Sequence, residues 1–258
     1  MITDLLHAYD QQMRGVPPKP AAGVTHEWDG PVLRVVGEHR GLVTGPRDLG
    51  VEGAALDALI ARQRDFFAAR GESVEWKTRA HDHPGDIARR LLKAGFTAEE
   101  TETVMIGLVA DVVAEPVLPA GVTLREVDAP EDLRRIAAME SQVWDADMGW
   151  LADDLAVRLA AAPDDLTVLV AEADGRVVSA AWLAYRPGTE FASLWGGSTL
   201  AAWRGRGIYR ALVAERARRA FARGVRWLHV DASDDSRPIL ARLGFQAVTT
   251  TTPYVWTP

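Results

Sequence analysis

The stretch Gly196–Ala211, which reads GGSTLAAWRGRGIYRA, combines closely spaced glycines with arginines. Gly205 and Gly207 allow a tight turn because neither residue carries a Cβ atom. Successive backbone N–H groups in such a turn point into one concavity that binds an anion. A helix predicted to start at residue 208 would add unpaired N–H donors and the positive end of its dipole. The stretch therefore predicts a binding site for a phosphate or a pyrophosphate.

The arginines and their spacing narrow the class of phosphate ligand. Arg204, Arg206 and Arg210 supply positive charge for a phosphate. The dinucleotide motif G-x-G-x-x-G does not fit, because Arg210 stands where the third glycine is required. A nucleotide P-loop would need Gly-Lys-Ser or Gly-Lys-Thr, and the stretch contains neither. What fits is an Arg-x-x-Gly-x-small loop between a strand and an amphipathic helix.

The residues around this loop alternate between strand and helix patterns. Apolar residues after residue 208 recur at the spacing of one helical face, and Gly224 fits a helix stop. Asp174-Gly175 is a hairpin turn signal. The predicted strands are 122–127, 166–173, 177–185, 191–200, 225–230, 245–252 and 254–256, and the predicted helices are 130–143, 150–161, 208–223 and 236–243. This order predicts an α/β domain with a mixed sheet.

The segment 114–121 separates this region from the first part of the chain. It contains two prolines and carries little helix or strand signal. We interpret it as a linker between a domain at 1–113 and a domain at 122–258, both of ordinary domain size.

The first domain holds a weaker copy of a unit found in the second. In the first, Val74-Glu-Trp76 precedes a predicted helix at 87–94 and Gly95-Phe96. In the second, Val225-Arg-Trp227 precedes a short helix and Gly244-Phe245. Both domains therefore contain the same series: a strand whose third residue is Trp, then a helix, then Gly-Phe. We interpret the two halves of the chain as an internal duplication.

The composition excludes several classes of protein. The 258 residues are 48% hydrophobic and 25% charged, which is typical of a globular chain. The net charge of -7 argues against nucleic-acid binding, which needs a basic face. The absence of cysteine excludes disulfides, thiolate zinc sites and a cysteine nucleophile. No signal-peptide pattern and no run of roughly 18 apolar residues occurs, so we expect a cytoplasmic protein without a membrane partner.

The loop between the predicted strand and the amphipathic helix reads Arg204-Gly205-Arg206-Gly207-Ile208. In this position it resembles the acetyl-CoA pyrophosphate loop of the GNAT acyltransferase superfamily. The resemblance covers about 122–256, and the helix that ends in Leu243-Gly244-Phe245 also resembles the last helix of that family. It implies an α/β (α+β) fold of two GNAT-like domains, each a mixed, mostly antiparallel sheet flanked by helices, as in tandem GNAT proteins. Tyr209 departs from the pattern, because the family usually has Gly or Ala there. We expect its ring to pack under the loop, with a place in the acyl pocket as the alternative.

The first domain is expected to be degenerate. The segment before its first predicted helix, Gly45–Gly53, lacks closely spaced glycines between arginines. It carries Asp48 and Glu52, whose charges would repel phosphate. We therefore expect the first domain not to bind CoA, and to cover one side of the second and shape the acceptor cleft.

The resemblance implies direct attack of an amine on the thioester of acetyl-CoA. A backbone N–H on the strand before the loop would hold the carbonyl oxygen. The residues expected to bind the cofactor are Ser198, Thr199, Leu200, Arg204, Gly205, Arg206, Gly207, Ile208, Tyr209, Arg210 and Ser236. Ser236 has a helix N-cap as its alternative role.

The catalytic acid and base are less defined. By position, the resemblance makes Glu190 the first candidate for the general base and Asp231 the second, while water alone is the third. The alternative for Glu190 is a solvated carboxylate in a turn, and the alternative for Asp231 is to cap the following helix. Many relatives have a Tyr acid on the last helix, but the matching position is near Leu240, so Tyr209 and Tyr254 are the substitutes.

The function expected from these residues is acetyl transfer from acetyl-CoA, as co-substrate, to the amine of a small molecule, without a metal. A non-catalytic acyl-CoA sensor and an assembly protein are the alternatives. The acidic net charge favours a cationic acceptor. Tryptophans at 144, 150, 182 and 195 would give that acceptor an apolar or aromatic part if they line the cleft. No pattern in the sequence specifies the oligomeric state.

Overall fold

The computed structural model of the chain describes residues 2–17, 23–37 and 39–258. The chain forms two compact units. Unit 1 comprises Met1–Met105, Asp231–Pro238 and Gln246–Pro258, and unit 2 comprises Ile106–Val230 and Ile239–Phe245. The domains expected from the sequence, 1–113 and 122–258, differ from these units, because the segments Asp231–Pro238 and Gln246–Pro258 belong to unit 1.

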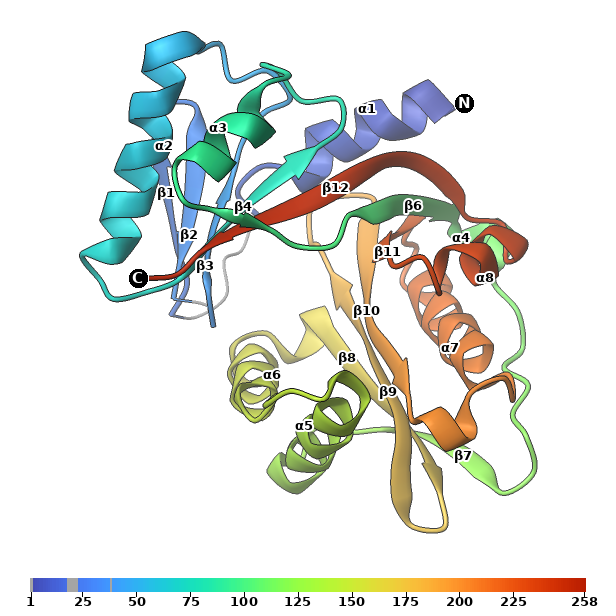
Figure 1. Cartoon of the computed structure of the whole chain (residues 1–258). Coiled ribbons are helices and arrows are strands. Elements are labelled where there is room, and N and C mark those ends of the chain that lie inside the picture. The colour runs from blue at the N-terminus through green and yellow to red at the C-terminus, as the bar shows by residue number, and fades with distance from the viewer. Residues whose placement is uncertain (1, 18–22, 38) are drawn as a thin grey trace. The chain divides into compact units, whose positions relative to one another are not determined.

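Unit 1 is a mixed, mostly antiparallel sheet with helices (Figure 1). Its strands hydrogen-bond in the order β1-β2-β3-β4-β12, and β5 also pairs with β12. Only the β3–β4 pair is parallel among the registered pairs of this unit. Its elements are α1 (Ile2–Met13), β1 (Thr25–Asp29), β2 (Val32–Val36), β3 (Gly41–Thr44), α2 (Gly53–Ala68), β4 (Val74–Arg79), α3 (Ile87–Lys93), β5 (Thr97–Ala98) and β12 (Gln246–Trp256). Apolar side chains of α2, α3 and the sheet form one core.

The last strand differs from the prediction of two short strands. The structure has one strand, β12, whose residues Thr251–Trp256 pair with β4. Pro253 lies inside it and takes part through its carbonyl oxygen, which accepts a hydrogen bond from Glu99 N–H at 2.9 Å. The prediction of a break at Pro253 was therefore wrong, because a proline that serves as an acceptor need not end a strand.

The duplicated unit ends its helix in the same way in both places. After α3, Gly95 N–H donates to Leu92 O and Phe96 N–H to Leu91 O. After α8 (Arg237–Arg242), Gly244 and Phe245 repeat this pattern with the carbonyl groups of residues 241 and 240. Both glycines have positive φ, 92° and 98°, which favours glycine at a helix C-terminus. The matching sequence thus corresponds to matching local structure.

A cluster of charged side chains lies in unit 1 around Glu102, at the start of β6 (Glu102–Leu108). Burial and the carboxylate of Asp231 raise the pKa of Glu102 to about 7, and the charge of Lys77 only partly opposes them. Lys77 Nζ lies 2.6 Å from Asp231 Oδ2. Burial lowers the pKa of Lys77, but the charges of Asp231 and Glu75 raise it above its usual range overall.

Glu102→Gln is expected to stabilise unit 1 above pH 7 and to change little below pH 4.5. The folded state binds the Glu102 proton more tightly than the unfolded chain, where the carboxyl titrates near 4.5. The stability due to this proton is complete below pH 4.5 and is lost as the pH rises through about 7. Thermal unfolding across this range measures it, with exposed Glu100→Gln as control. A Tm difference that does not change with pH would contradict the prediction.

The strands of unit 2 hydrogen-bond in the order β7-β8-β9-β10-β11. The β10–β11 pair is parallel and the others are antiparallel. In Figure 1, α5 and α6 lie on one face of these strands and α7 lies on the other. The elements are α4 (Val109–Val112), β7 (Val122–Glu126), α5 (Pro130–Trp144), α6 (Trp150–Ala161), β8 (Leu166–Ala173), β9 (Arg176–Tyr185), β10 (Phe191–Thr199), α7 (Ile208–Ala222), β11 (Trp227–Ala232) and α8, with short 3-10 turns at 163–165 and 201–203.

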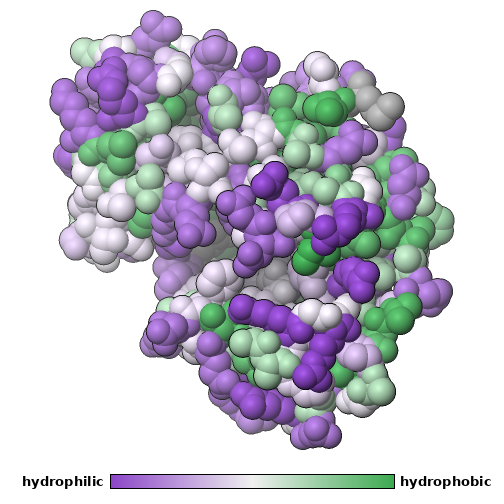
Figure 2. Space-filling model, turned by 45° about the vertical axis from the view of Figure 1, so that its right-hand side comes forward, coloured by the Kyte–Doolittle hydropathy of each residue, from purple (hydrophilic) through white to green (hydrophobic). Residues whose placement is uncertain are grey.

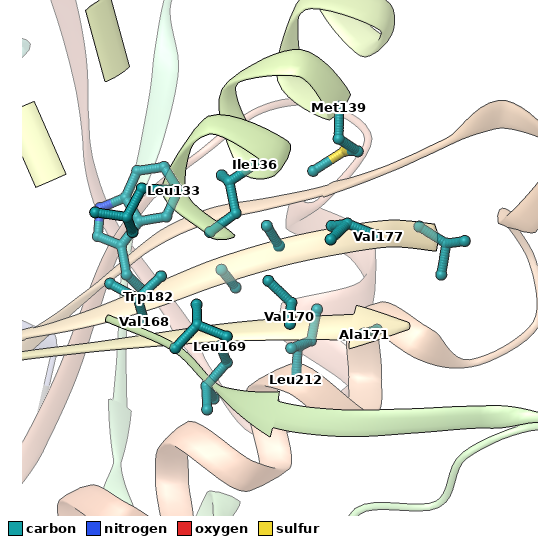
Figure 3. Close-up of a cluster of buried hydrophobic side chains, with 14 of the residues drawn as sticks. Leu133, Ile136, Met139, Val168, Leu169, Val170, Ala171, Val177, Trp182 and Leu212 are labelled. Atoms are coloured by element: carbon teal, nitrogen blue, oxygen red, sulfur yellow. The ribbon is translucent and has the colours of Figure 1, made fainter. Parts of the chain in front are cut away.

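The core of unit 2 explains why these elements form. Leu133, Ile136 and Met139 point from α5 toward apolar side chains of β8 and β9 (Figure 3). Leu212 of α7 is also completely buried in this cluster. The predicted strands and helices of this region match the structure to within about two residues at each end, a usual uncertainty in element boundaries. The predicted linker at 114–121 forms no helix or strand.

No helix of the described residues is long and apolar enough to cross a membrane. On the face in Figure 2, hydrophilic side chains cover much of the surface, and hydrophobic ones gather mainly toward its right-hand side.

Candidate functional site

The loop between β10 and α7 has the backbone geometry that the sequence predicts. Gly205 and Gly207 have φ angles of 74° and 89°, which favour glycine over other residues. Gly207 is the N-cap of α7, and no side chain caps this helix. The first N–H groups of α7 have no intrahelical acceptor, so a ligand with negative charge can bind them.

The arginines of the loop have different roles. Arg204 Nε donates to Thr199 O at 3.0 Å and so ties the loop to the end of β10. The guanidinium of Arg206 lies over the ring of Trp203, 4.7 Å from its centre. Among the described residues, no carboxylate pairs with Arg206 or Arg210. Their positive charge is therefore not neutralised by the protein beside the open helix end.

Strands β10 and β11 run together and then separate. Phe191, Ala192 and Ser193 pair with residues 227–229 of β11, and the described residues form no further pair between these two strands. Ser193 Oγ lies 3.2 Å from His229 Nδ1 at the last pair. Beyond this point, the edge of β10 that faced β11 carries no ladder with that strand, so its backbone groups can bind a ligand.

A β-bulge lies in the separated part of β10. The pairing with β9 shifts register between Gly196 and Ser198, and Gly196 and Gly197 have φ angles of 65° and 92°. Ser198 O accepts a hydrogen bond from Ser179 Oγ at 2.6 Å. Of the backbone donors expected at 198–200, Leu200 N–H already donates to Val178 O at 3.0 Å. Leu200 is therefore excluded as a free donor in this structure.

Glycine is required at both bulge positions because aromatic rings lie against them. A Cβ atom on Gly196 would lie 2.7 Å from Cζ3 of Trp182, and one on Gly197 would lie 2.7 Å from Cε2 of Tyr209. Both distances are shorter than normal van der Waals contacts. The ring of Tyr209 thus packs against the bulge of β10.

Arg216 of α7 holds the bulge from the same side as Tyr209. Its side chain is buried and donates to the carbonyl oxygens of Leu212, Trp182 and Trp195 at 3.0, 3.3 and 3.1 Å. Burial lowers the pKa of Arg216 to about 10. The guanidinium therefore fixes the backbone of β9 and β10 at the register shift. The sequence pattern alone does not indicate this role of Arg216.

The structure does not bring Glu190 to the bulge. Its carboxylate lies 2.8 Å from Arg226 Nη1, and its side chain is 44% exposed. Glu190 precedes the first residue of β10 and lies seven residues before Gly197. At about 3.3 Å per residue, this separation is about 23 Å along the strand.

Three other expected residues belong to unit 1 and not to the unit of the loop. Asp231 is ion-paired with Lys77. Ser236 hydrogen-bonds to Ser233, which turns the chain before α8. Tyr254 is 8% exposed in the core of unit 1, a position that serves packing. This burial argues against Tyr254 as a proton donor to a bound substrate.

Glu140 is a buried acidic residue that was not among the residues predicted for the site. It is 1% exposed on α5, and burial raises its pKa, although the side chains of Ser198 and Trp144 oppose this rise. One signal in the sequence could have indicated it: Glu140 follows Leu133 and Ile136 at seven and four residues, on the apolar face of a predicted helix. An acidic residue at such a position is unusual.

Comparisons with known proteins indicate a family for part of the chain and a fold for nearly all of it. Residues 131–245 match the model of the acetyltransferase (GNAT) family. No curated protein matches the sequence. A solved GCN5-related N-acetyltransferase from Kribbella flavida is 19% identical with a TM-score of 0.67, over 100% of this chain and 94% of that chain.

Two further solved structures share the fold along nearly the whole chain. A tandem GNAT protein from the clavulanic acid biosynthesis pathway is 13% identical with a TM-score of 0.63, over 98% of this chain and 93% of that chain. A GCN5-related N-acetyltransferase from Sphaerobacter thermophilus is 18% identical with a TM-score of 0.60, over 99% of this chain and 91% of that chain. At these identities, the likeness shows a common fold.

Proposed function

We propose that residues 131–245, which match the model of the acetyltransferase (GNAT) family, form an acetyltransferase domain, and that the protein transfers an acetyl group from acetyl-CoA to the amine of a small molecule. The observation that carries the proposal is the loop at 204–208, with its two left-handed glycines at the uncapped start of α7. It lies at the end of a strand that has separated from its parallel neighbour.

The pyrophosphate of acetyl-CoA would bind the N–H groups around Gly205 and Gly207 and at the start of α7. Arg206 and Arg210 would add charge, while Arg204 keeps its bond to β10. Ile208 is buried in the core of unit 2 and so anchors the first turn of the helix. The pantetheine chain would run along the edge of β10 that no longer pairs with β11.

The acetyl group would lie near the bulge, where a backbone N–H of Ser198 or Thr199 would hold the carbonyl oxygen. One such donor typically contributes about 2.7–4 kcal/mol to the transition state. The amine nitrogen would attack the thioester carbon directly in a complex that holds both substrates. Holding the two substrates together supplies a further part of the acceleration.

We propose that unit 1 has no CoA site of its own. Its corresponding segment, 45–53, leads into α2. Asp48 Oδ1 accepts the N–H of Gly50 at 2.9 Å, so a carboxylate uses a donor that a phosphate would need. Glu52 is the N-cap of α2 and adds a second negative charge.

A calorimetric titration of acetyl-CoA into the protein tests the proposal. We expect one site per chain, followed by CoA release when a panel of amines is added. Two sites per chain would contradict a unit 1 without a CoA site. Binding without CoA release for any amine would indicate an acyl-CoA sensor, and no binding at millimolar ligand would contradict both readings.

A further inference from the structure

The carboxyl group of Glu140 is buried and only half satisfied. Its Oε2 accepts the indole N–H of Trp144 at 2.9 Å, across one turn of α5. Its Oε1 has no hydrogen-bond partner among the described residues. An unpaired buried oxygen of this kind costs free energy, and more so when the group is ionised.

Glu140 lies at the bulge of β10. The side chain of Ser198, the first residue after the register shift, lies close enough to this carboxyl group to oppose the rise in its pKa. Trp182 of β9 pairs with Trp195 of β10, and Ala180 of β9 pairs with Ser198 of β10. Ala180 and Trp182 are two residues apart on β9 and so face the same side of the sheet, which places Ser198 on the same face as both tryptophans. The half-satisfied carboxyl group is therefore on that face, beside the strand expected to hold the acetyl group.

The same face carries a second unsatisfied polar atom. The indole Nε1 of Trp182 is buried and has no acceptor among the described residues. Trp144 and Trp195 are 61% and 48% exposed, although large aromatic side chains are usually well covered. A buried acceptor and a buried donor thus have no protein partner, and each has an exposed indole beside it: Trp144 is hydrogen-bonded to Glu140, and Trp195 is paired with Trp182.

We propose that Glu140 binds the ammonium group of the acceptor and takes its proton, and that the acceptor is a primary amine with an aromatic group. This inference rests on the proposed function of the same unit. The ammonium would pair with Oε1, and the aromatic part would lie against Trp144 or Trp195. Indole faces also attract cations, which favours a protonated amine over a neutral acceptor.

The proposed step is balanced in atoms and charge. The ammonium gives one proton to the Glu140 carboxylate and becomes a neutral amine. The amine nitrogen forms the C–N bond with the acetyl carbon, and the C–S bond of the thioester breaks. The second proton from nitrogen goes to the CoA thiolate, and Glu140 returns its proton to solvent.

The charge around Glu140 suits this role. Burial raises its pKa, and only the neutral side chains of Ser198 and Trp144 oppose that rise. Among the described residues, no arginine or lysine is paired with this carboxylate, so a cationic substrate meets no competing cation there. On α5, the charged side chains that form ion pairs, Glu131, Asp132, Arg134 and Arg135, all pair with groups other than Glu140.

The test compares wild type with Glu140→Gln on two probes, 2-phenylethylamine, which is protonated at neutral pH, and aniline, which is not. We expect kcat/KM for 2-phenylethylamine to fall by about 10²-fold or more and the rise of rate with pH to disappear. Aniline should be affected far less. Acetyl-CoA affinity should not change, and Tm should not fall, because the substitution removes a buried charge. Glu131→Gln, at the exposed start of the same helix, is the matched control and should behave as wild type.

Each result is decisive. Equal activity and an unchanged pH profile in Glu140→Gln would overturn the inference while the proposed function stands. Equal losses on both amines with a lower Tm would make Glu140 a structural residue only. Wild type that releases CoA with other amines but uses neither probe would overturn the substrate class. Wild type that binds no acetyl-CoA would overturn the proposed function itself. If Glu140→Gln fails to fold, Glu140→Asp keeps the carboxylate and should raise KM while retaining the pH dependence.

Discussion

Gly207→Asp is expected to abolish acetyl-CoA binding in a calorimetric titration. Gly207 has a φ of 89°, a conformation that costs a residue with a Cβ atom about 1–2 kcal/mol. The new carboxylate would stand at the N-cap of α7, where the phosphates are expected to bind. Two like charges about 4 Å apart repel by about 4 kcal/mol at an effective dielectric constant of 20, which corresponds to about 10³-fold in affinity.

Gly207→Ala separates the two effects, because it adds the Cβ atom without the charge. A Cβ there would lie 3.6 Å from Arg210 Nη2, an ordinary contact, so we expect a loss of about tenfold from backbone strain alone. The fold should persist in both variants, as measured by Tm. Wild-type affinity in Gly207→Asp would show that the loop does not bind the phosphates.

Arg216→Ala is expected to lower the free energy of unfolding by about 3–5 kcal/mol. The substitution leaves a cavity in the core of unit 2, and such truncations typically cost about 2–5 kcal/mol. It also removes the donors to the carbonyl oxygens of Trp182 and Trp195 at the bulge. Each buried carbonyl left without a partner costs about 1–3 kcal/mol, partly offset because no charge is then buried. Urea unfolding followed by tryptophan fluorescence measures the change.

Two further variants make the Arg216 prediction specific. Arg216→Met fills most of the volume without hydrogen bonds, so it should cost less than Arg216→Ala and still lower the affinity for acetyl-CoA. Arg218→Met, two residues along the same helix and 45% exposed, should change stability by less than about 0.5 kcal/mol. An Arg216→Met protein more stable than wild type, with unchanged affinity, would show that the guanidinium does not hold the bulge.

Much of unit 2 follows from patterns between near neighbours in the chain. The helix at 150–161 and the strand at 166–173 have the bounds that the periodicity predicts. The loop at 204–208 has the left-handed glycines that its spacing requires. The Gly-Phe pairs at 95–96 and 244–245 close their helices in the same way. In each case, the physical cause is the conformational preference of a few consecutive residues, and the sequence contains it directly.

What the sequence did not determine depends on which distant segments meet. Tyr254 is a core residue because β12 pairs with β4 in unit 1, a partner far away in the chain. Glu190 is remote from the bulge because a strand is long, so two residues on one strand need not share a site. Glu140 and Ser198 meet only because α5 packs on the face of β10 that carries Ser198.

The candidate site therefore divides into two parts with different origins. The phosphate loop is encoded locally, since glycine φ angles and a helix start are properties of a short segment. The chemistry of the acceptor depends on a carboxyl group whose burial and missing partner arise only when helix and sheet pack together. Strand register and long-range packing decide such contacts, and the free energies that select them come from residues spread over the whole fold.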